Sequence, residues 1–480
     1  MNFIKACQCD EPFFFNMFDY KSVHKKIIVD TLTPVSIYLK LRDQFSNTIL
    51  LESSDYIAKD NSYAYICCNP VSKFYVKKNV LTIEYPDKKI EEKKLNDLSN
   101  IISELTDFIS KFNISEEPEK NKKFITKGLF GYMSYDSVKF FENINIENKS
   151  YGDDIPEIFY SFYSEIIVVN TFNNEATLIS QTGNLEQITN IEKIIKTKNI
   201  SEFGFKLEDE LESNLKDKEF IEMVKKGIDH CYRGDVFQIV LSRKFAQKFS
   251  GDEFCVYRQL RSINPSPYLF YFDYGSFKIF GSSPEAQLVI KDKIAEIHPI
   301  AGTFKRTGDD IVDSEKAIKL FKDDKENSEH MMLVDLARND LSRSCTNVKV
   351  DKDREIQFYS HVIHLVSKVS GELKSNSRDI IGSTFPAGTL SGAPKHMAMK
   401  LIEKYEEHNR SFYGGAIGFI GFDNDFNHAI VIRSFLSKNQ KLFLQAGAGV
   451  VSKSDPKNEL QEIYNKIGAL LKALKKAEEI

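Results

Sequence analysis

Tryptophan and long apolar runs are both missing from this chain of 480 residues. A helix that crosses a membrane needs about 20 consecutive, mostly apolar residues, so the sequence predicts no membrane span. The N-terminal segment has no basic stretch followed by a clean apolar run, which argues against a secretory signal peptide. We therefore expect a cytoplasmic protein.

Cysteine, glycine and charge are distributed in ways that exclude several other classes of protein. The seven cysteines are odd in number, and no CxxC pair has a second Cys or His pair to face it. Neither a disulfide framework nor a zinc site is therefore predicted. No GxGxxG or GxxxxGKS/T loop for a nucleotide is present. With a formal net charge of -4 and a pI of about 6.2, nothing favours binding to nucleic acid or an anionic membrane.

The residues that are present are typical of a globular protein, with 42% hydrophobic and 28% charged side chains. The length is sufficient for one large core or about two or three ordinary ones. The hydrophobic pattern changes after a polar, weakly patterned stretch at residues 173–215. We predict the main boundary there, with one part over residues 1–205 and a second over residues 206–480.

Helices are expected at several places. Residues 218–235 carry apolar side chains at every fourth position and end at Gly234, which predicts an amphipathic helix. The C-terminal helix has a marked start, with Asp455 as its cap and Pro456 at its first helical position. The charged segment at residues 91–100 is expected to form a surface helix.

Strands are expected in groups. A strand over residues 236–245 would place Phe237, Ile239 and Leu241 on one face. Three more strands, separated by short turns that favour antiparallel pairing, are predicted at residues 412–422, 428–436 and 442–451. Runs of strands with helices between the groups indicate an α+β fold and not a doubly wound parallel sheet.

Two pairs of glutamates have a spacing that places both carboxylates on neighbouring helix surface. Glu326 and Glu329 form one pair, and Glu459 and Glu462 form the other. Two such helices facing each other would offer oxygen ligands to Mg²⁺. From the spacing alone, two solvated acidic faces are the favoured interpretation.

Arg433 lies in the strand expected at residues 428–436, on one face with Ala429, Val431 and Phe435. A guanidinium in an apolar row needs an anionic partner, because an unpaired buried charge is very costly. The partner is either an acidic side chain or a ligand carboxylate, and the sequence leaves both alternatives open. The planar guanidinium suits bidentate carboxylate binding better than a lysine would.

Glycines and a histidine are further candidates. Gly447 and Gly449 lie inside an expected strand, where glycine serves either a close ligand or tight sheet packing. His364 alternates with apolar residues in a strand-like segment, and such a residue is more often a hydrogen-bonded core histidine. No Ser-His-Asp or Cys-His arrangement is evident.

Eight ordered segments resemble the chorismate-utilising enzymes, and within them the anthranilate synthase component I group. They are SSPE, HPIAGT, SEHMMLVDLARNDL, HLVSKVSGEL, FPAGTLSGAPK, YGGAIGF, IVIRS and QAGAGVV. In the first half, DTLTPVSIYLKLR and ILLESS carry the resemblance. It implies a layered αββα chorismate-binding domain with antiparallel sheets over residues 206–480. Residues 1–205 would be a regulatory part that packs against this domain.

The resemblance also implies the site residues, position by position. Glu329 and Glu462 would bind Mg²⁺, with Glu326 and Glu459 close beside them. The implied chorismate-binding residues are Gly302, Thr303, Thr389, Tyr413, Arg433, Gly447, Ala448 and Gly449. The implied catalytic positions are Glu285, His364 and Gln238. Glu285 suits a general acid if burial raises its pKa, and His364 suits later proton transfers.

The implied reaction converts chorismate and ammonia to anthranilate and pyruvate, toward tryptophan. Relatives that add water to C2 carry Lys at the position of Gln238, and aminodeoxychorismate synthase carries Lys at the position of Ala301. A Gln cannot deprotonate water, and an Ala cannot attack C2 covalently, so both positions favour ammonia as the nucleophile. No glutaminase signature is present, so use of glutamine implies an amidotransferase subunit, expected in a heterotetramer. The alternatives are aminodeoxychorismate synthase component I and an inactive tryptophan-binding regulatory homologue.

Feedback inhibition by L-tryptophan is a further implication of the resemblance. Ser53 matches one wall of the family's inhibitor site, and Pro267, Tyr268 and Leu269 match the other. Without the resemblance, these residues would be interpreted as a buried strand end and a turn with two prolines.

Overall fold

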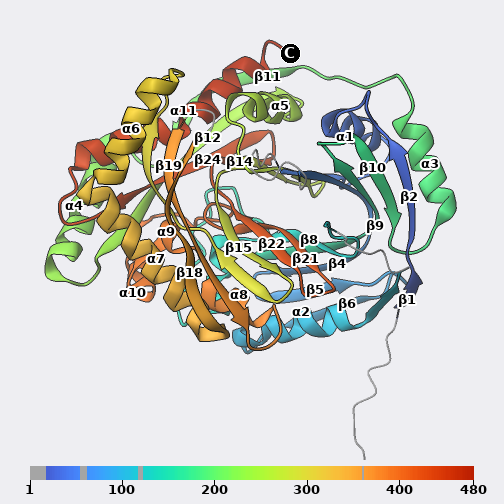
Figure 1. The fold of residues 1–480 in the computed structure, drawn as a ribbon, viewed down its shortest axis with the longest axis horizontal. Coiled ribbons are helices and arrows are strands. Elements are labelled where there is room, and N and C mark those ends of the chain that lie inside the picture. Colours follow the sequence, from blue (N-terminus) through green and yellow to red (C-terminus); the bar gives the residue numbers. More distant parts are fainter. Residues whose placement is uncertain (1–17, 54–61, 117–122, 359–361) are drawn as a thin grey trace, which may run out of the picture.

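The computed structural model describes residues 18–53, 62–116, 123–358 and 362–480. Strands and helices alternate in groups along the chain (Figure 1). No helix in these ranges is long and apolar enough to cross a membrane. The α+β architecture expected from the sequence is therefore confirmed.

The first sheet contains strands from both halves of the chain. They are β2 (Val23–Ile28), β3 (Ile49–Ser53), β4 (Tyr63–Lys77), β9 (Ile158–Asn170), β10 (Glu175–Ser180), β11 (Phe205–Ser213), β12 (Gln238–Gly251), β13 (Tyr268–Asp273), β14 (Lys278–Ser283), β23 (Ser434–Lys438) and β24 (Lys441–Val450). Their order is β11–β12–β24–β23–β14–β13–β3–β4–β9–β10–β2. Every pairing in this order is antiparallel, as predicted.

A second antiparallel sheet continues from β9. Its strands are β8 (Gly128–Met133), β15 (Ala286–Lys291), β16 (Ile294–Ile297), β17 (Ile300–Lys305), β18 (Cys345–Phe358), β19 (Val362–Leu373), β21 (Ala416–Gly421) and β22 (Phe426–Ile430). The order is β9–β8–β21–β22–β15–β16–β19–β18, and β17 also pairs with β19. The two sheets are joined because β9 pairs with β10 near its end and with β8 near its start.

Short strands and helices complete the fold. The remaining strands are β1 (Phe18–Lys21), β5 (Val80–Glu84), β6 (Ile90–Lys94), β7 (Phe112–Ser115) and β20 (Gly392–Ala393). The helices are α1 (Pro34–Arg42), α2 (Ile101–Ser110), α3 (Leu185–Ile195), α4 (Asp217–Arg233), α5 (Phe254–Ile263), α6 (Asp310–Lys322), α7 (Asp324–Ser344), α8 (Asp379–Thr384), α9 (Gly388–Ser391), α10 (Lys395–Tyr405) and α11 (Pro456–Ala477), with 3-10 turns at Leu98–Asn100 and Tyr135–Phe140.

Three apolar clusters show how these elements are layered. Leu50 and Tyr271 of the first sheet pack with helices α1, α4, α5 and α11. Their strand neighbours Leu51 and Phe270 point the other way, into a cluster that also contains Ile417 of the second sheet. A third cluster joins the outer face of the second sheet to α2, α7 and α8. The alternation of side chains along each strand thus produces an αββα arrangement.

Helix ends follow the local signals in the sequence. Helix α4 ends where Gly234 adopts φ of 79°, a left-handed conformation that costs glycine little. Helix α11 begins where the Asp455 carboxylate accepts hydrogen bonds from the backbone of Lys457 and Asn458.

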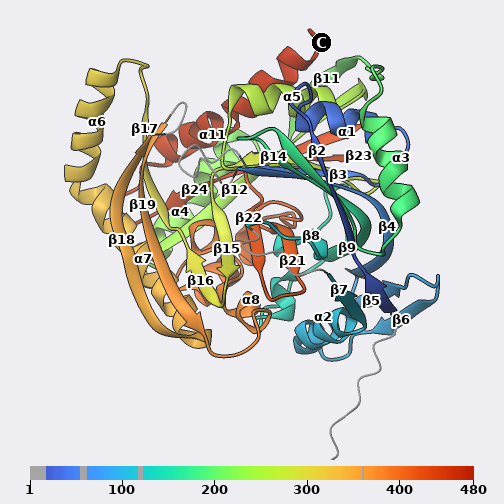
Figure 2. The same cartoon turned by 45° about the vertical axis from the view of Figure 1, so that its right-hand side comes forward.

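In Figure 2, helix α6 and strands β17–β19 project along one edge of the molecule.

Two expectations about local structure in these segments were wrong. Residues 91–100 do not form the expected surface helix, because the segment up to Lys94 belongs to strand β6, which pairs with β5. A 3-10 turn follows at Leu98–Asn100, and helix α2 begins at Ile101. Residues 173–215, where the main boundary was predicted, form β10, α3 and β11, since long-range pairing supplies the order that local pattern lacks. Phe237 precedes β12 and its side chain is exposed, while Ile239 is buried.

The strand expected at residues 428–436 is also broken in two. Strand β22 ends at Ile430 and pairs with β21 and β15, whereas β23 begins at Ser434 and pairs with β14 and β24. The chain therefore crosses from the second sheet to the first between these residues. Arg433 lies in the crossing with φ of 49°, so it does not share a strand face with Ala429.

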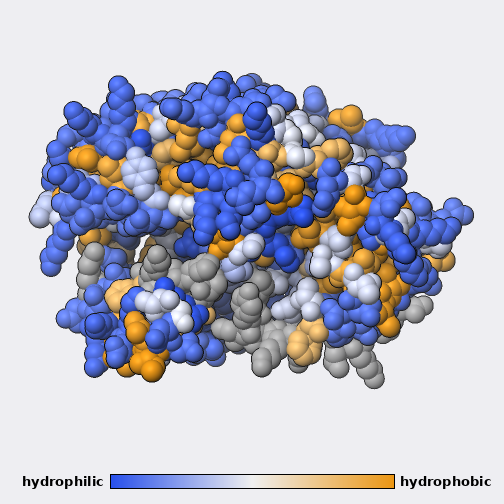
Figure 3. All heavy atoms as spheres, turned by 90° about the horizontal axis from the view of Figure 1, so that it is seen from above, coloured by the Kyte–Doolittle hydropathy of each residue, from blue (hydrophilic) through white to orange (hydrophobic). Residues whose placement is uncertain are grey.

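The surface seen in Figure 3 is largely hydrophilic, and hydrophobic residues form separate islands on it. Single exposed apolar residues are normal for soluble chains and need no separate explanation.

Candidate active site

Glu285 is a buried acid between β14 and β15. Its carboxylate accepts a hydrogen bond from the Thr389 hydroxyl at 3.0 Å, and Thr389 lies in the short helix α9. Burial raises the pKa of Glu285 to about 8, although Thr389, Arg433 and Lys466 act in the opposite direction. Near neutral pH this carboxyl is therefore mostly protonated and can donate a proton.

His364 of β19 is buried and faces Gly302 of β17. Its Nδ1 lies 2.8 Å from the Gly302 carbonyl oxygen, which can only accept, so Nδ1 carries the proton. Burial lowers the pKa of His364 to about 4, and Arg433 acts in the same direction, although the Gly302 hydrogen bond opposes them. The imidazole is neutral at physiological pH, and Nε2 is its basic atom. Thr303 belongs to β17, and its side chain lies outside the described part of the chain.

Arg433 acts electrostatically on both Glu285 and His364, which places the three side chains in one neighbourhood. Its guanidinium makes no hydrogen bond or ion pair with the residues that the structure describes. Burial lowers its pKa, and Glu285 only partly opposes this. A buried cation without a protein partner is a strong attractor for a ligand carboxylate.

Strands β12 and β24 form a second wall. A methyl group added at Gly447 would lie 2.8 Å from the Tyr413 hydroxyl, and one at Gly449 would lie 2.6 Å from the Gln238 amide nitrogen. These glycines therefore keep backbone close to both side chains. Ala448 is fully buried in the cluster that faces the helices, so only its backbone can face the site.

Lys466 on α11 was not anticipated from the sequence. Its Nζ donates to the Gly447 carbonyl oxygen at 2.7 Å and pairs with Glu462 at 2.6 Å. The only sequence signal is its position four residues after Glu462 on one helix face. Lys466 thus joins the strand that carries the glycines to one of the expected metal ligands.

The four expected metal ligands lie in two pairs on two helices. Glu326 and Glu329 belong to α7, and Glu459 and Glu462 belong to α11. A methyl group at Gly302, where φ is 67°, would lie 3.2 Å from the Glu326 carboxylate, so this glutamate lies against the site.

The donor chemistry of these carboxylates suits Mg²⁺. Glu459 is buried, with 8% of its surface exposed, as a carboxylate held for a cation can be. Within the described ranges, no three His, Cys, Asp or Glu side chains are close enough together to form a metal site.

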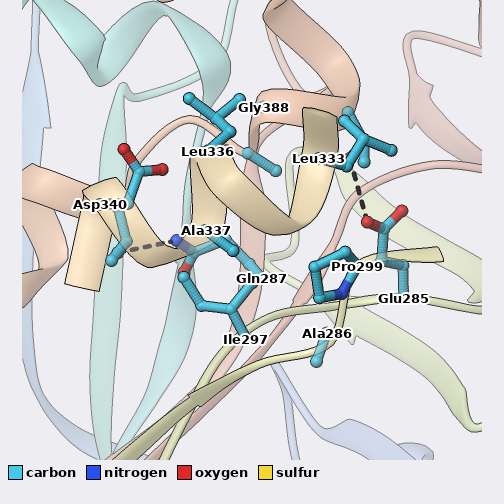
Figure 4. A pocket seen from close by; sticks show the side chains of 13 residues that line it. Glu285, Ala286, Gln287, Ile297, Pro299, Leu333, Leu336, Ala337, Asp340 and Gly388 are labelled. Carbon is cyan, nitrogen blue, oxygen red and sulfur yellow. Dashed lines mark hydrogen bonds between the residues drawn. The ribbon is translucent and has the colours of Figure 1, made fainter. Parts of the chain in front are cut away.

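A small cavity of about 30 Å³ lies beside Glu285. Figure 4 shows Glu285 and Gln287 extending from β15 and the preceding turn toward the helix that carries Leu336 and Asp340. This volume holds about two or three water molecules, since a water needs about 10–15 Å³ by this measure. Thr389 also lines this cavity, so the hydroxyl that binds Glu285 borders the same small space.

The expected inhibitor residues lie on adjacent strands. Ser53 at the end of β3 is directly opposite Tyr268 of β13, and Leu269 is buried opposite Glu52. Pro267 immediately precedes β13. Two segments more than 200 residues apart in sequence are thus neighbours in space.

Comparison with known proteins shows the family to which the chain belongs. A family model described as chorismate binding enzyme matches residues 66–472. Anthranilate synthase component 1 of Aquifex aeolicus is 36% identical over 484 residues and covers 95% of each chain. The protein of the same name from Bacillus subtilis is 36% identical over 480 residues, covering 94% of this chain and 92% of that protein.

Solved structures have the same fold. The crystal structure of anthranilate synthase component I from Streptococcus pneumoniae superposes with a TM-score of 0.73 at 29% identity, covering 93% of this chain and 99% of that one. The isochorismate synthase MenF of Escherichia coli has a TM-score of 0.71 at 17% identity, covers 94% of each chain and shows the fold alone. The chain belongs to the chorismate-binding enzymes, in the anthranilate synthase component 1 group.

Proposed function

We propose that this chain converts chorismate and ammonia to anthranilate and pyruvate. The observation that carries the proposal is the grouping of a protonated acid, Glu285, a neutral base, His364, and a cation without a described partner, Arg433. Chorismate needs each of these, because it carries carboxylates, loses a poor leaving group and later loses a ring proton. The supporting likeness is to relatives named anthranilate synthase component 1.

In the first step, ammonia forms a bond to C2 of the ring while the C4 hydroxyl leaves. Glu285 donates its proton to this hydroxyl, which departs as water. Arg433 binds the enolpyruvyl carboxylate through its planar guanidinium, together with the backbone of Gly447–Gly449. Gln238 lies beside Gly449 and cannot deprotonate water, which favours ammonia as the nucleophile.

In the second step, the ring becomes aromatic and pyruvate leaves. Nε2 of His364 accepts the C2 proton while the bond from C3 to the enolpyruvyl oxygen breaks. The enolpyruvyl methylene carbon takes up a proton, which gives pyruvate. Ala301, where aminodeoxychorismate synthase has Lys, leaves no group for covalent attack on C2.

Mg²⁺ is the proposed cofactor. Glu329 and Glu462 would hold it, with Glu326 and Glu459 beside them and water and substrate oxygens completing its ligands. When bound, the ion supplies Lewis-acid stabilisation to the ring carboxylate.

The proposal also includes a partner subunit, feedback inhibition and the roles of the two parts of the chain. A glutamine amidotransferase subunit, in a heterotetramer, would deliver ammonia to a cytoplasmic enzyme. L-tryptophan would bind between Ser53 and Pro267–Leu269 and inhibit the enzyme in feedback, with residues 1–205 as the regulatory part and 206–480 as the catalytic part.

Product identification tests the function directly. Purified enzyme with chorismate, Mg²⁺ and ammonium should form anthranilate and pyruvate in equal amounts, while Glu285→Gln should not. Accumulation of aminodeoxychorismate would refute the proposal in favour of the para-directed relative, and absence of any product would favour a binding protein.

A further inference from the structure

Arg410 is one of the largest fully buried side chains of the described residues and takes no part in the proposed chemistry. It lies in the loop between α10 and β21, with 2% of its surface exposed. A substrate therefore cannot touch it. Burying a guanidinium so completely costs free energy unless its donors are satisfied.

The guanidinium donates to three separate parts of the fold. Nε and Nη2 bind the Glu406 carboxylate at 2.8 and 2.6 Å. Nη1 donates to the Leu390 carbonyl oxygen at 2.6 Å, and Nη2 donates to the Val240 carbonyl oxygen at 2.7 Å. The guanidinium carbon also lies 5.8 Å from the centre of the Tyr413 ring.

Each of these contacts adjoins a wall of the active site. Leu390 follows Thr389, which binds Glu285. Val240 of β12 is directly opposite Gly449 of β24. Tyr413 has its hydroxyl against Gly447. A single planar side chain thus links α9, β12 and the Tyr413 loop from behind the site.

Glu406 extends the same network. Its Oε1 accepts hydrogen bonds from the backbone N–H and the hydroxyl of Ser242, both at 2.8 Å. Gln445 donates to the Ser242 hydroxyl at 2.7 Å. Ser242 is the partner of Gly447 across the two strands. The Arg410–Glu406 ion pair is therefore hydrogen-bonded directly to β12 and, through Ser242, to Gln445 of β24.

We infer that Arg410 is a positioning residue, which holds Thr389, Tyr413 and the β12–β24 wall in register for the reaction. The inference rests on the proposed function. A guanidinium is required because its rigid, planar set of donors reaches three acceptors at fixed angles, which a lysine ammonium cannot do. Misplacing a site wall by about 1 Å can cost about a hundredfold in rate.

The test separates positioning from stability. Arg410→Ala alone would leave the Glu406 carboxylate buried without its cation, which is strongly destabilising. The main variant is therefore Arg410→Met with Glu406→Gln, which removes both charges, keeps the volume and leaves an acceptor for Ser242. The matched control is Arg42→Met with Asp252→Asn, at a partly buried ion pair of 2.6 Å between α1 and the residues that precede α5.

We expect the main variant to fold with a melting temperature near that of wild type but to lose about a hundredfold in kcat/KM for chorismate. The alkaline limb of its plot of kcat/KM against pH should move to higher pH, because a displaced Thr389 no longer stabilises the Glu285 carboxylate and the pKa of Glu285 rises. The control variant should keep wild-type kcat/KM. In Arg410→Ala, added guanidinium should restore part of the activity, whereas the main variant, whose space is filled, should not respond.

Three results would overturn the inference. The first is a main variant with wild-type kcat/KM. The second is a loss of activity with an unmoved alkaline limb and no response of Arg410→Ala to guanidinium. The third is an equal loss in the control variant. Failure of the proposed function looks different, because wild-type enzyme itself would then form no anthranilate.

Discussion

The raised pKa of Glu285 allows a sharp prediction about pH. The carboxyl must be protonated to act as a general acid, and burial places its pKa at about 8. Activity should therefore be lost as pH rises through that value. About 90% of Glu285 should be protonated at pH 7 and about 10% at pH 9, so kcat/KM should fall about tenfold between them.

Replacing Thr389 with valine should move this limb in a defined direction. The Thr389 hydroxyl donates to the carboxylate and so lowers its pKa. A hydrogen bond to a charged group contributes about 1.5 kcal/mol, and one pKa unit corresponds to about 1.4 kcal/mol. The alkaline limb of Thr389→Val should therefore lie about one unit above that of wild type.

The assay is the initial rate of anthranilate formation at limiting chorismate, from pH 6 to 10, with ammonia corrected to its free-base concentration. Ser391→Ala is the matched control, because Ser391 lies on the same turn but its hydroxyl donates to Ala387. The alkaline limb of Ser391→Ala should stay at the pH at which wild type has it. An alkaline limb of Thr389→Val at or below the wild-type position would refute the reasoning, as would Glu285→Gln with wild-type kcat.

Other residues yield shorter predictions. Arg433→Lys keeps the charge but loses the planar pair of donors, so KM for chorismate should rise about tenfold or more in steady-state kinetics. Glu329→Gln and Glu462→Gln should each lower activity more than about tenfold at saturating Mg²⁺, and a change within about threefold would contradict their role as ligands. Ser53→Phe should abolish inhibition by L-tryptophan and spare catalysis, as judged from activity with and without the amino acid. Unchanged activity of the wild-type enzyme in millimolar L-tryptophan would contradict the regulatory proposal.

Local chemistry determined those parts of the fold that depend on neighbours in sequence. The spacing of apolar residues and Gly234 predicted α4, and Asp455 with Pro456 predicted the start of α11, because capping and helix periodicity act within a few residues. The ordered motifs also predicted the family and the α+β architecture. The surface helix predicted for the charged residues 91–100 was wrong, because pairing of β6 with β5 overrides local preference.

Only the tertiary structure decided what depends on contacts between distant residues. Arg433 appeared to lie on one continuous strand, yet the chain crosses between sheets there and delivers its guanidinium to the site. The protonation of Glu285 comes from burial, which no sequence pattern records. Arg410 carried no signal at all in the sequence. Its importance follows from acceptors on segments up to 170 residues away, which only the folded chain brings within hydrogen-bonding distance.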